Sequence, residues 1–200
     1  MFTIQIDQAS LDRAFASMEK QVRFAAAQAL TKTAQDAQEA VRRQLPDRFT
    51  IRSNWLSKGI RIIPATPSRL ESTVVVKDAF MVQQETGGER TSPFGDALGI
   101  PVGARPTPTA VTRPSKFPAA LLLKPGFFIA PIRRGSKTMG VWKRTGKGRR
   151  ERLTLMYVFS RSVQLRPRFG FRETVRQIAM ERLPRRFEEA LRHAMETARR

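Results

Sequence analysis

The feature that most constrains this fold is an apolar stripe that runs at helical spacing through the first part of the chain. Its members recur every three or four residues: Leu11, Phe15, Met18, Val22, Ala25, Ala29, Thr33, Ala37 and Val41. This spacing places them on one face of an α-helix, which we predict to be capped by Ser10 and ended by Pro46. At ~1.5 Å per residue the helix would be about 50 Å long. We interpret it as a core helix, with packing against a neighbouring subunit as the alternative.

Short strands are predicted on both sides of this helix. Ile4 and Ile6 alternate with polar residues before it, which is typical of a strand. After it, a helical turn is expected between the cap Ser53-Asn54 and Gly59. Three runs rich in β-branched or aromatic residues are the next predicted strands: 60–63, 70–77 and 80–84.

The third quarter of the chain predicts a hairpin followed by the clearest strand of the sequence. The predicted strands are 127–129, 139–142, 153–159 and 162–165. A basic turn at 133–137 joins the first two. The last helical region is predicted from about Phe171, with Pro184 as a break or as the first turn of a second helix. Phe187 and Leu191 are expected to pack on the sheet.

Glycine and proline interrupt regular structure throughout 86–116. A segment of this length without regular structure is usually functional or disordered, so we predict an extended arm or mobile loop, with an insertion of no function as the alternative. The order of elements predicts an α+β fold: a long N-terminal helix packed on an antiparallel β-sheet, C-terminal helices and a long Pro/Gly-rich loop. We expect residues 1–200 to form a single domain.

The positive charge is concentrated in the second half of the sequence. Residues 1–100 contain 13 Lys and Arg against 11 Asp and Glu, whereas residues 101–200 contain 24 against 6. Self-repulsion of this size is unfavourable unless an anionic partner screens it. That partner is DNA, RNA or an acidic protein surface. An anionic membrane is disfavoured because the last helix has an alanine-rich apolar face without tryptophan.

The sequence lacks the features of several classes of protein, and although an enzyme is not excluded, nothing in the sequence favours one. Without cysteine there are no disulfides or thiolate metal sites, and we expect no signal peptide and no membrane-spanning segment. The single histidine, His193, has polar and small neighbours on the last helix, and the adjacent Glu188 and Glu189 point in different directions. We therefore predict a protein that is not an enzyme and has no catalytic residues, cofactor or metal.

The best candidate site is a set of basic residues in two loops that join predicted strands. They are Arg133, Arg134, Lys137, Lys143, Arg144, Lys147, Arg149, Arg150 and Arg152. We expect both loops to emerge from one end of the sheet and to contact phosphates or an acidic partner. Trp142 and Tyr157 lie within apolar runs, so we expect them to fill the core, with stacking on bases as the alternative.

Three stretches in matching order resemble the minor tail protein Z family of long-tailed phages. These are the ending MERLPRRFEEAL at 180–191, the alanine-rich run AAAQALTKTA at 25–34, and VWKR at 141–144 followed by a basic loop and an apolar strand. The resemblance implies a tail-completion protein, a structural virion component at the head-proximal end of the tail. Such a protein helps to join tail to head and to hold the genome end, and the family has no catalytic residues to carry over.

The expected partners follow from this resemblance and from the charge. They are copies of the chain in a hexameric ring, tail terminator, tail tube or head–tail connector proteins, and genomic DNA. The expected location is the virion, with the host cytoplasm during assembly, and no membrane partner is expected. The alternative is a free basic nucleic-acid-binding protein.

Overall fold

The structure, a computed structural model, describes residues 8–92 and 95–198. The predicted strand at Ile4 and Ile6 lies outside the described residues. The chain forms two compact units. Unit 1 consists of residues 1–46, 55–79 and 169–200, and unit 2 of residues 47–54 and 80–168. The expectation of a single domain stays a prediction.

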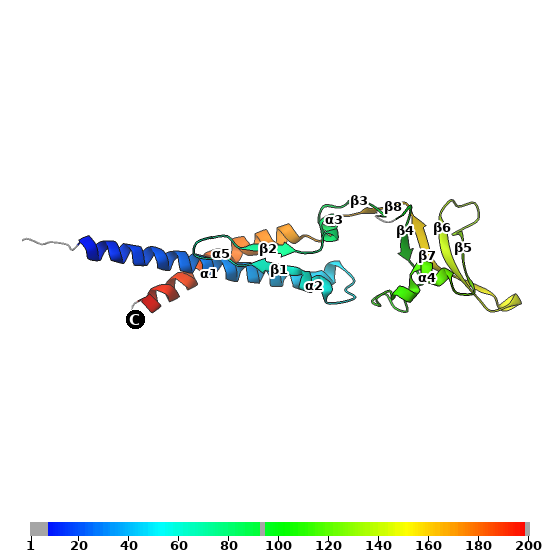
Figure 1. Ribbon diagram of the computed structural model, residues 1–200, viewed down its shortest axis with the longest axis horizontal. Helices are drawn as coiled ribbons and strands as arrows, with labels where there is room; N and C mark the ends of the chain where they lie inside the picture. The colour runs from blue at the N-terminus through cyan, green and yellow to red at the C-terminus, as the bar shows by residue number, and fades with distance from the viewer. Residues whose placement is uncertain (1–7, 93–94, 199–200) are drawn as a thin grey trace, which may run out of the picture. The chain divides into compact units, whose positions relative to one another are not determined.

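The described residues form helices and short antiparallel strands (Figure 1). In unit 1 the elements are α1 (Gln8–Arg48, whose last two residues belong to unit 2), α2 (Trp55–Gly59), β1 (Ile60–Ile63), β2 (Thr73–Val76) and α5 (Phe171–Ala198). In unit 2 they are α3 (Phe80–Thr86), β3 (Gly88–Thr91), β4 (Leu98–Pro101), η1 (Pro114–Lys116), α4 (Pro118–Leu122), β5 (Phe127–Pro131), β6 (Met139–Thr145), η2 (Gly148–Arg150), β7 (Arg152–Ser160) and β8 (Ser162–Leu165).

Within unit 1, α1 and α5 pack side by side in antiparallel directions (Figure 1). Near the start of α5, the Thr174 hydroxyl donates to Gln44 Oε1 near the end of α1 over 2.8 Å. Further along, the helices meet at four buried alanines: Ala25, Ala29, Ala190 and Ala194. Phe187 and Leu191 pack against this alanine seam instead of on a sheet. Small side chains let two helix axes approach closely, so the alanine-rich run forms a helix–helix contact.

The β1–β2 hairpin is attached to α1 by side-chain hydrogen bonds. The carbonyl of Ile60 accepts from Gln38 Nε2 and from Arg42 Nη2, each over 2.7 Å. Thr31 Oγ1 accepts from the amide of Ala65 over 3.1 Å. These bonds satisfy backbone groups at the hairpin and hold it on the helix. The predicted α+β fold, with a long N-terminal helix packed on antiparallel strands, is confirmed.

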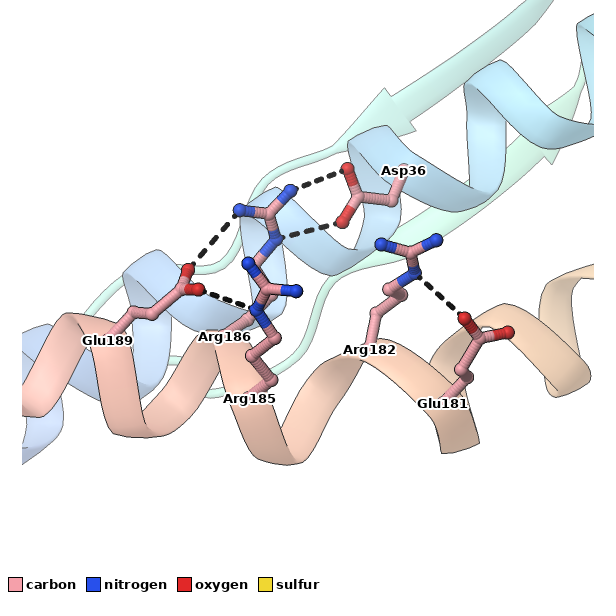
Figure 2. Close-up of polar contacts among 6 residues, drawn as sticks. All are labelled: Asp36, Glu181, Arg182, Arg185, Arg186 and Glu189. Carbon is pink, nitrogen blue, oxygen red and sulfur yellow. Dashed lines mark hydrogen bonds and ion pairs between the residues drawn. The ribbon is translucent and has the colours of Figure 1, made fainter.

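Arg186 joins α5 to α1 through a two-pronged ion pair with Asp36 (Figure 2). Its Nε and Nη2 donate to the two carboxylate oxygens over 2.9 and 3.0 Å. Glu189 accepts from Arg185 over 2.8 Å and from Arg186 over 3.4 Å. The hydrogen bond to Asp36 raises the pKa of Arg186, and the hydrogen bond from Arg185 lowers the pKa of Glu189. Arg185 and Arg186 of α5 thus have carboxylate partners inside unit 1.

Unit 2 is organised around a four-stranded antiparallel sheet in the order β4-β7-β6-β5. A second ladder pairs β3 with β8. Helix α4 covers one face of the larger sheet, where Leu121 packs with Val141 and Tyr157, all at most 3% exposed. The predicted hairpin at 127–142 and the predicted strands at 153–159 and 162–165 are confirmed as β5, β6, β7 and β8.

The predicted helix ends at Ser10, Pro46 and Pro184 are wrong. Helix α1 begins two residues before Ser10 and continues past Pro46, and α5 is a single helix that contains Pro184. Both prolines lie on exposed surface, where water can bind the carbonyl that each leaves without an amide partner. The C-terminal region is thus one helix and not the predicted C-terminal helices.

Two further predictions of secondary structure also differ from the structure. Residues 80–84, predicted as a strand, lie in α3, where Met81 and Gln84 are buried at helical spacing. The segment 86–116 contains β3 and β4. Strand β4 lies at a sheet edge and ends at Pro101, which is a position where proline is tolerated.

We predict that Ala29→Leu destabilises unit 1 because the added methylenes do not fit between α1 and α5. Overpacking of this kind costs about 1–3 kcal/mol of unfolding free energy, measurable by urea denaturation. Ala16→Leu is the matched control, because Ala16 is exposed on the same helix and its replacement should change stability little. Equal stabilities of the two variants would contradict the tight packing of the seam.

Candidate polyanion-binding surface

The positive charge of the chain is concentrated in unit 2. This unit contains 19 Lys and Arg against 5 Asp and Glu, a net charge of +14. Unit 1 contains 18 against 12, a net charge of +6. The asymmetry between sequence halves is therefore an asymmetry between folded units. Because like charges raise the local potential together, unit 2 is the part of the chain that most strongly attracts an anion.

The two basic turns lie at opposite ends of the four-stranded sheet, so the prediction that they emerge from one end is wrong. The first turn joins β5 to β6 and the second joins β6 to β7, and both pairs are antiparallel. Successive hairpin turns must then alternate between the two ends of a sheet. Figure 1 shows the two turns on either side of the sheet. With the seven residues of β6 between them, the turns are about 20 Å apart.

The β5–β6 turn presents three exposed cations: Arg133, Arg134 and Lys137. The turn is closed by a hydrogen bond from the amide of Ile132 to the carbonyl of Thr138 over 3.0 Å. Inside it, the amide of Ser136 donates to the carbonyl of Arg133 over 3.0 Å. These bonds hold the backbone of a short turn, so its cationic side chains project from a defined position.

The β6–β7 turn also presents three exposed cations: Lys147, Arg149 and Arg150. Arg149 and Arg150 lie in η2, which begins at Gly148. Gly146 has φ +80° and its backbone lies against the carbonyl of Arg150, where a Cβ would collide. Glycine at 146 is therefore required by the turn.

The remaining three predicted residues lie on strands and are divided between the two faces of the sheet. Cα pairing places Lys143 on the face covered by α4, opposite Phe127, and Arg144 on the other face. The Arg144 guanidinium lies 5.2 Å from the centre of the Phe128 ring and 3.1 Å from a Glu151 carboxylate oxygen. Arg152 begins β7 and is exposed. The structure thus groups the nine predicted residues in one unit but not at one point.

The two aromatic residues considered for stacking have different environments. Tyr157 is 3% exposed, its hydroxyl donates to the carbonyl of Lys116 over 2.9 Å, and desolvation by burial raises its pKa. The prediction that it fills the core is confirmed. The prediction that Trp142 also fills the core is wrong, because it lies on the face opposite the core cluster and is only partly buried. Its Nε1 donates to the carbonyl of Ala130 over 3.3 Å.

The sheet face that α4 does not cover is a possible functional surface that was not predicted from the sequence. We name it the aromatic face and define it by side chains that the strand pairing places together: Ile100, Phe128, Trp142, Arg144, Leu153, Leu155 and Val158. The register shift between Val141 and Trp142 displaces the strand pairing there. The alternation of side chains along a strand shows from the sequence that Phe127 and Phe128 point to opposite faces. Only the register between strands shows which residues of the other strands share each face.

Other basic residues of unit 2 have structural roles. The Nε of Arg52 donates to the carbonyl of Pro108 over 3.1 Å, and the Nε of Arg105 to Thr112 Oγ1 over 2.7 Å. Arg168 donates to Gln84 Oε1 over 2.9 Å and lies over the Phe49 ring. These side chains hold loops in place and are weaker candidates for partner contacts than the exposed turns.

Within residues 8–92 and 95–198, no group of three or more His, Asp or Glu side chains is placed to hold a metal ion. His193 is exposed on α5. No helix among the described residues combines the length and the apolar character needed to cross a membrane.

The chain matches no protein-family model, no curated protein and no solved structure.

We predict that Glu151→Gln strengthens the binding of polyanions. Glu151 is the only carboxylate between Asp96 and Glu173, and its removal both lowers local negative charge and releases Arg144. If one phosphate contact is added, the slope of log affinity against log salt should steepen by about 0.7–0.9. The measurement is the anisotropy of a labelled oligonucleotide over a series of salt concentrations.

The matched control for this variant is Glu71→Gln in unit 1. Glu71 forms an exposed ion pair with Arg69 at 3.1 Å, the same N–O distance as between Arg144 and Glu151. Its replacement makes the same change in net charge at a different place. Equal effects of the two substitutions would mean that only the total charge matters, and not the turn beside Arg144.

Proposed function

We propose that this chain is a structural protein of a phage head–tail junction, a tail-completion component whose unit 2 contacts an anionic partner. The observation that carries the proposal is the net charge of +14 on unit 2, with exposed cations at both ends of its sheet. Such a unit is favourable where it lies against DNA or an acidic protein surface. DNA passes through the head–tail junction, which provides a partner of this kind.

The division of the chain into two units fits a role in assembly. Unit 1 is a packed pair of helices in which Arg186, Arg185 and their acidic partners are already satisfied. Its long helix offers a surface for contacts between subunits in the proposed hexameric ring or with tail terminator, tail tube and connector proteins. The resemblance to the minor tail protein Z family supports the same role.

The alternative function is a free nucleic-acid-binding protein. It is favoured by the fact that both basic turns belong to one sheet of one chain, so no neighbouring subunit is needed to complete the surface. The two functions differ in where the protein is found and in whether the isolated monomer binds nucleic acid tightly.

We expect the protein to copurify with phage tails or whole virions from cells that produce the particles. A component of the head–tail junction remains bound through density-gradient purification, and mass spectrometry of the purified particles detects it. A protein that is abundant in the lysate and absent from the particles would overturn the proposed structural role and leave the alternative.

We predict that replacing Arg149, Arg150 and Arg152 together by glutamine flattens the salt dependence of DNA binding. Removing one arginine–phosphate interaction reduces the slope of log affinity against log salt by about 0.7–0.9, so the total reduction is about two to three. The slope is measured by titrating labelled DNA at several salt concentrations. An unchanged slope would show that these arginines do not bind phosphates.

The control replaces Arg43, Lys58 and Arg61 by glutamine. These three side chains are exposed in unit 1, so the variant loses the same charge away from the basic turns. We expect its slope to stay close to that of the unchanged protein.

A further inference from the structure

The aromatic face is the side of the four-stranded sheet that α4 does not cover. Antiparallel pairing puts Phe128 opposite Trp142, Trp142 opposite Leu155, and Arg144 opposite Leu153. Directly paired residues point to the same side of a sheet. The surroundings of Gly140 confirm that Leu155 points to this face, because a Cβ at Gly140 would meet the side chain of Leu155.

Apart from Arg144, the side chains of the aromatic face are apolar, and they are partly or largely accessible. Leu153 is 52% exposed and Ile100 is 38% exposed, and Phe128, Trp142, Leu155 and Val158 are partly buried. The core of unit 2 lies on the other face, around Leu121 and Tyr157. The apolar side chains of the aromatic face are therefore not required by the core cluster.

Two rings on this face are held in place by polar contacts at their edges or above them. The hydrogen bond from Trp142 Nε1 to Ala130 holds the indole across β5. The Arg144 guanidinium lies over Phe128. A held aromatic ring and a guanidinium plane are both surfaces on which nucleobases stack.

The charges around the face match an anionic strand. The cationic turns lie at the two ends of the sheet, about 20 Å apart, and the aromatic face extends between them. A chain that crosses the face from one turn to the other would place its backbone charges near both turns. Glu151 is the only carboxylate within 97–172 and is paired with Arg144, so little in this region repels phosphates.

We propose that the aromatic face binds an unpaired nucleic-acid strand, with bases stacked on Trp142 and beside Phe128 and Arg144, and phosphates near the two basic turns. This inference rests on the proposed contact of unit 2 with a polyanion and specifies that partner. A duplex keeps its bases stacked inside and presents mainly phosphates, so it would use the turns but leave the apolar side chains exposed. An unpaired strand can place its phosphates at the basic turns and its bases on the aromatic side chains.

The test uses the full chain with Trp55→Phe, which leaves Trp142 as the only tryptophan because the chain has two. An oligothymidylate of about 16 nucleotides is titrated against this protein, and indole fluorescence and affinity are both recorded. Stacking is expected to quench the fluorescence of Trp142. Trp142→Leu is expected to reduce affinity about 5- to 150-fold, which corresponds to the loss of one stacked base, whereas Trp142→Phe retains most of it.

Three controls separate stacking at Trp142 from other effects of the substitutions, from misfolding and from binding by charge alone. Trp55→Leu removes a tryptophan from unit 1 and should leave affinity unchanged. Far-ultraviolet circular dichroism checks the fold of each variant. If Trp142→Leu does not fold, the quenching experiment still tests the proposal, because it uses a protein that retains Trp142. A duplex of equal length should bind with a smaller dependence on Trp142.

The outcomes distinguish this inference from the function proposed above. Quenching by oligothymidylate, with weakened affinity in Trp142→Leu and near-normal affinity in Trp142→Phe, supports it. If single strand and duplex bind through the basic turns without quenching and without dependence on Trp142, the inference is overturned while the polyanion contact stands. Equal quenching by polyglutamate would overturn it in favour of an acidic protein partner, and the absence of binding to any polyanion would overturn the contact itself.

Discussion

Repulsion between the cations of unit 2 is the constraint on which the rest of this structure depends. Fourteen uncompensated positive charges lie on a unit built around one small sheet, whereas the arginines at the α1–α5 contact have carboxylate partners. Arg186 reaches Asp36 and Glu189 within unit 1, but Arg133 and Arg149 are exposed on turns. An external anion is the simplest way to lower the energy of such a surface, which is why a partner is central to the proposed function.

Antiparallel topology determines how this charge is presented. Because β5, β6 and β7 form successive hairpins, the two basic turns are separated by the length of β6 instead of forming one cluster. The same topology leaves one sheet face under α4 and the other with Phe128 and Trp142. An extended anionic chain fits this arrangement better than a compact anion, since a compact anion reaches only one turn.

Much of the secondary structure could be predicted because it depends on local periodicity. The three- and four-residue spacing of Val22, Ala25 and Ala29 indicates a helix, and the apolar run at 153–159 indicates a strand whatever lies beside it. The errors have two causes: an exposed helix face tolerates proline, and burial in the tertiary structure overrides a local preference for strand. Pro184 is accommodated inside α5 on an exposed face, and residues 80–84 form a helix because Met81 and Gln84 are buried together.

For the candidate site, the sequence by itself determined which residues carry the charge. The nine cations, and the scarcity of carboxylates around them, can be read directly from the sequence. Only the tertiary structure decided where those cations lie and which aromatic residues accompany them. The reason is that strand pairing acts between residues distant in sequence, so a register places Arg144 and Phe128 on one face and Lys143 and Phe127 on the other. A shift of one residue would exchange the two faces.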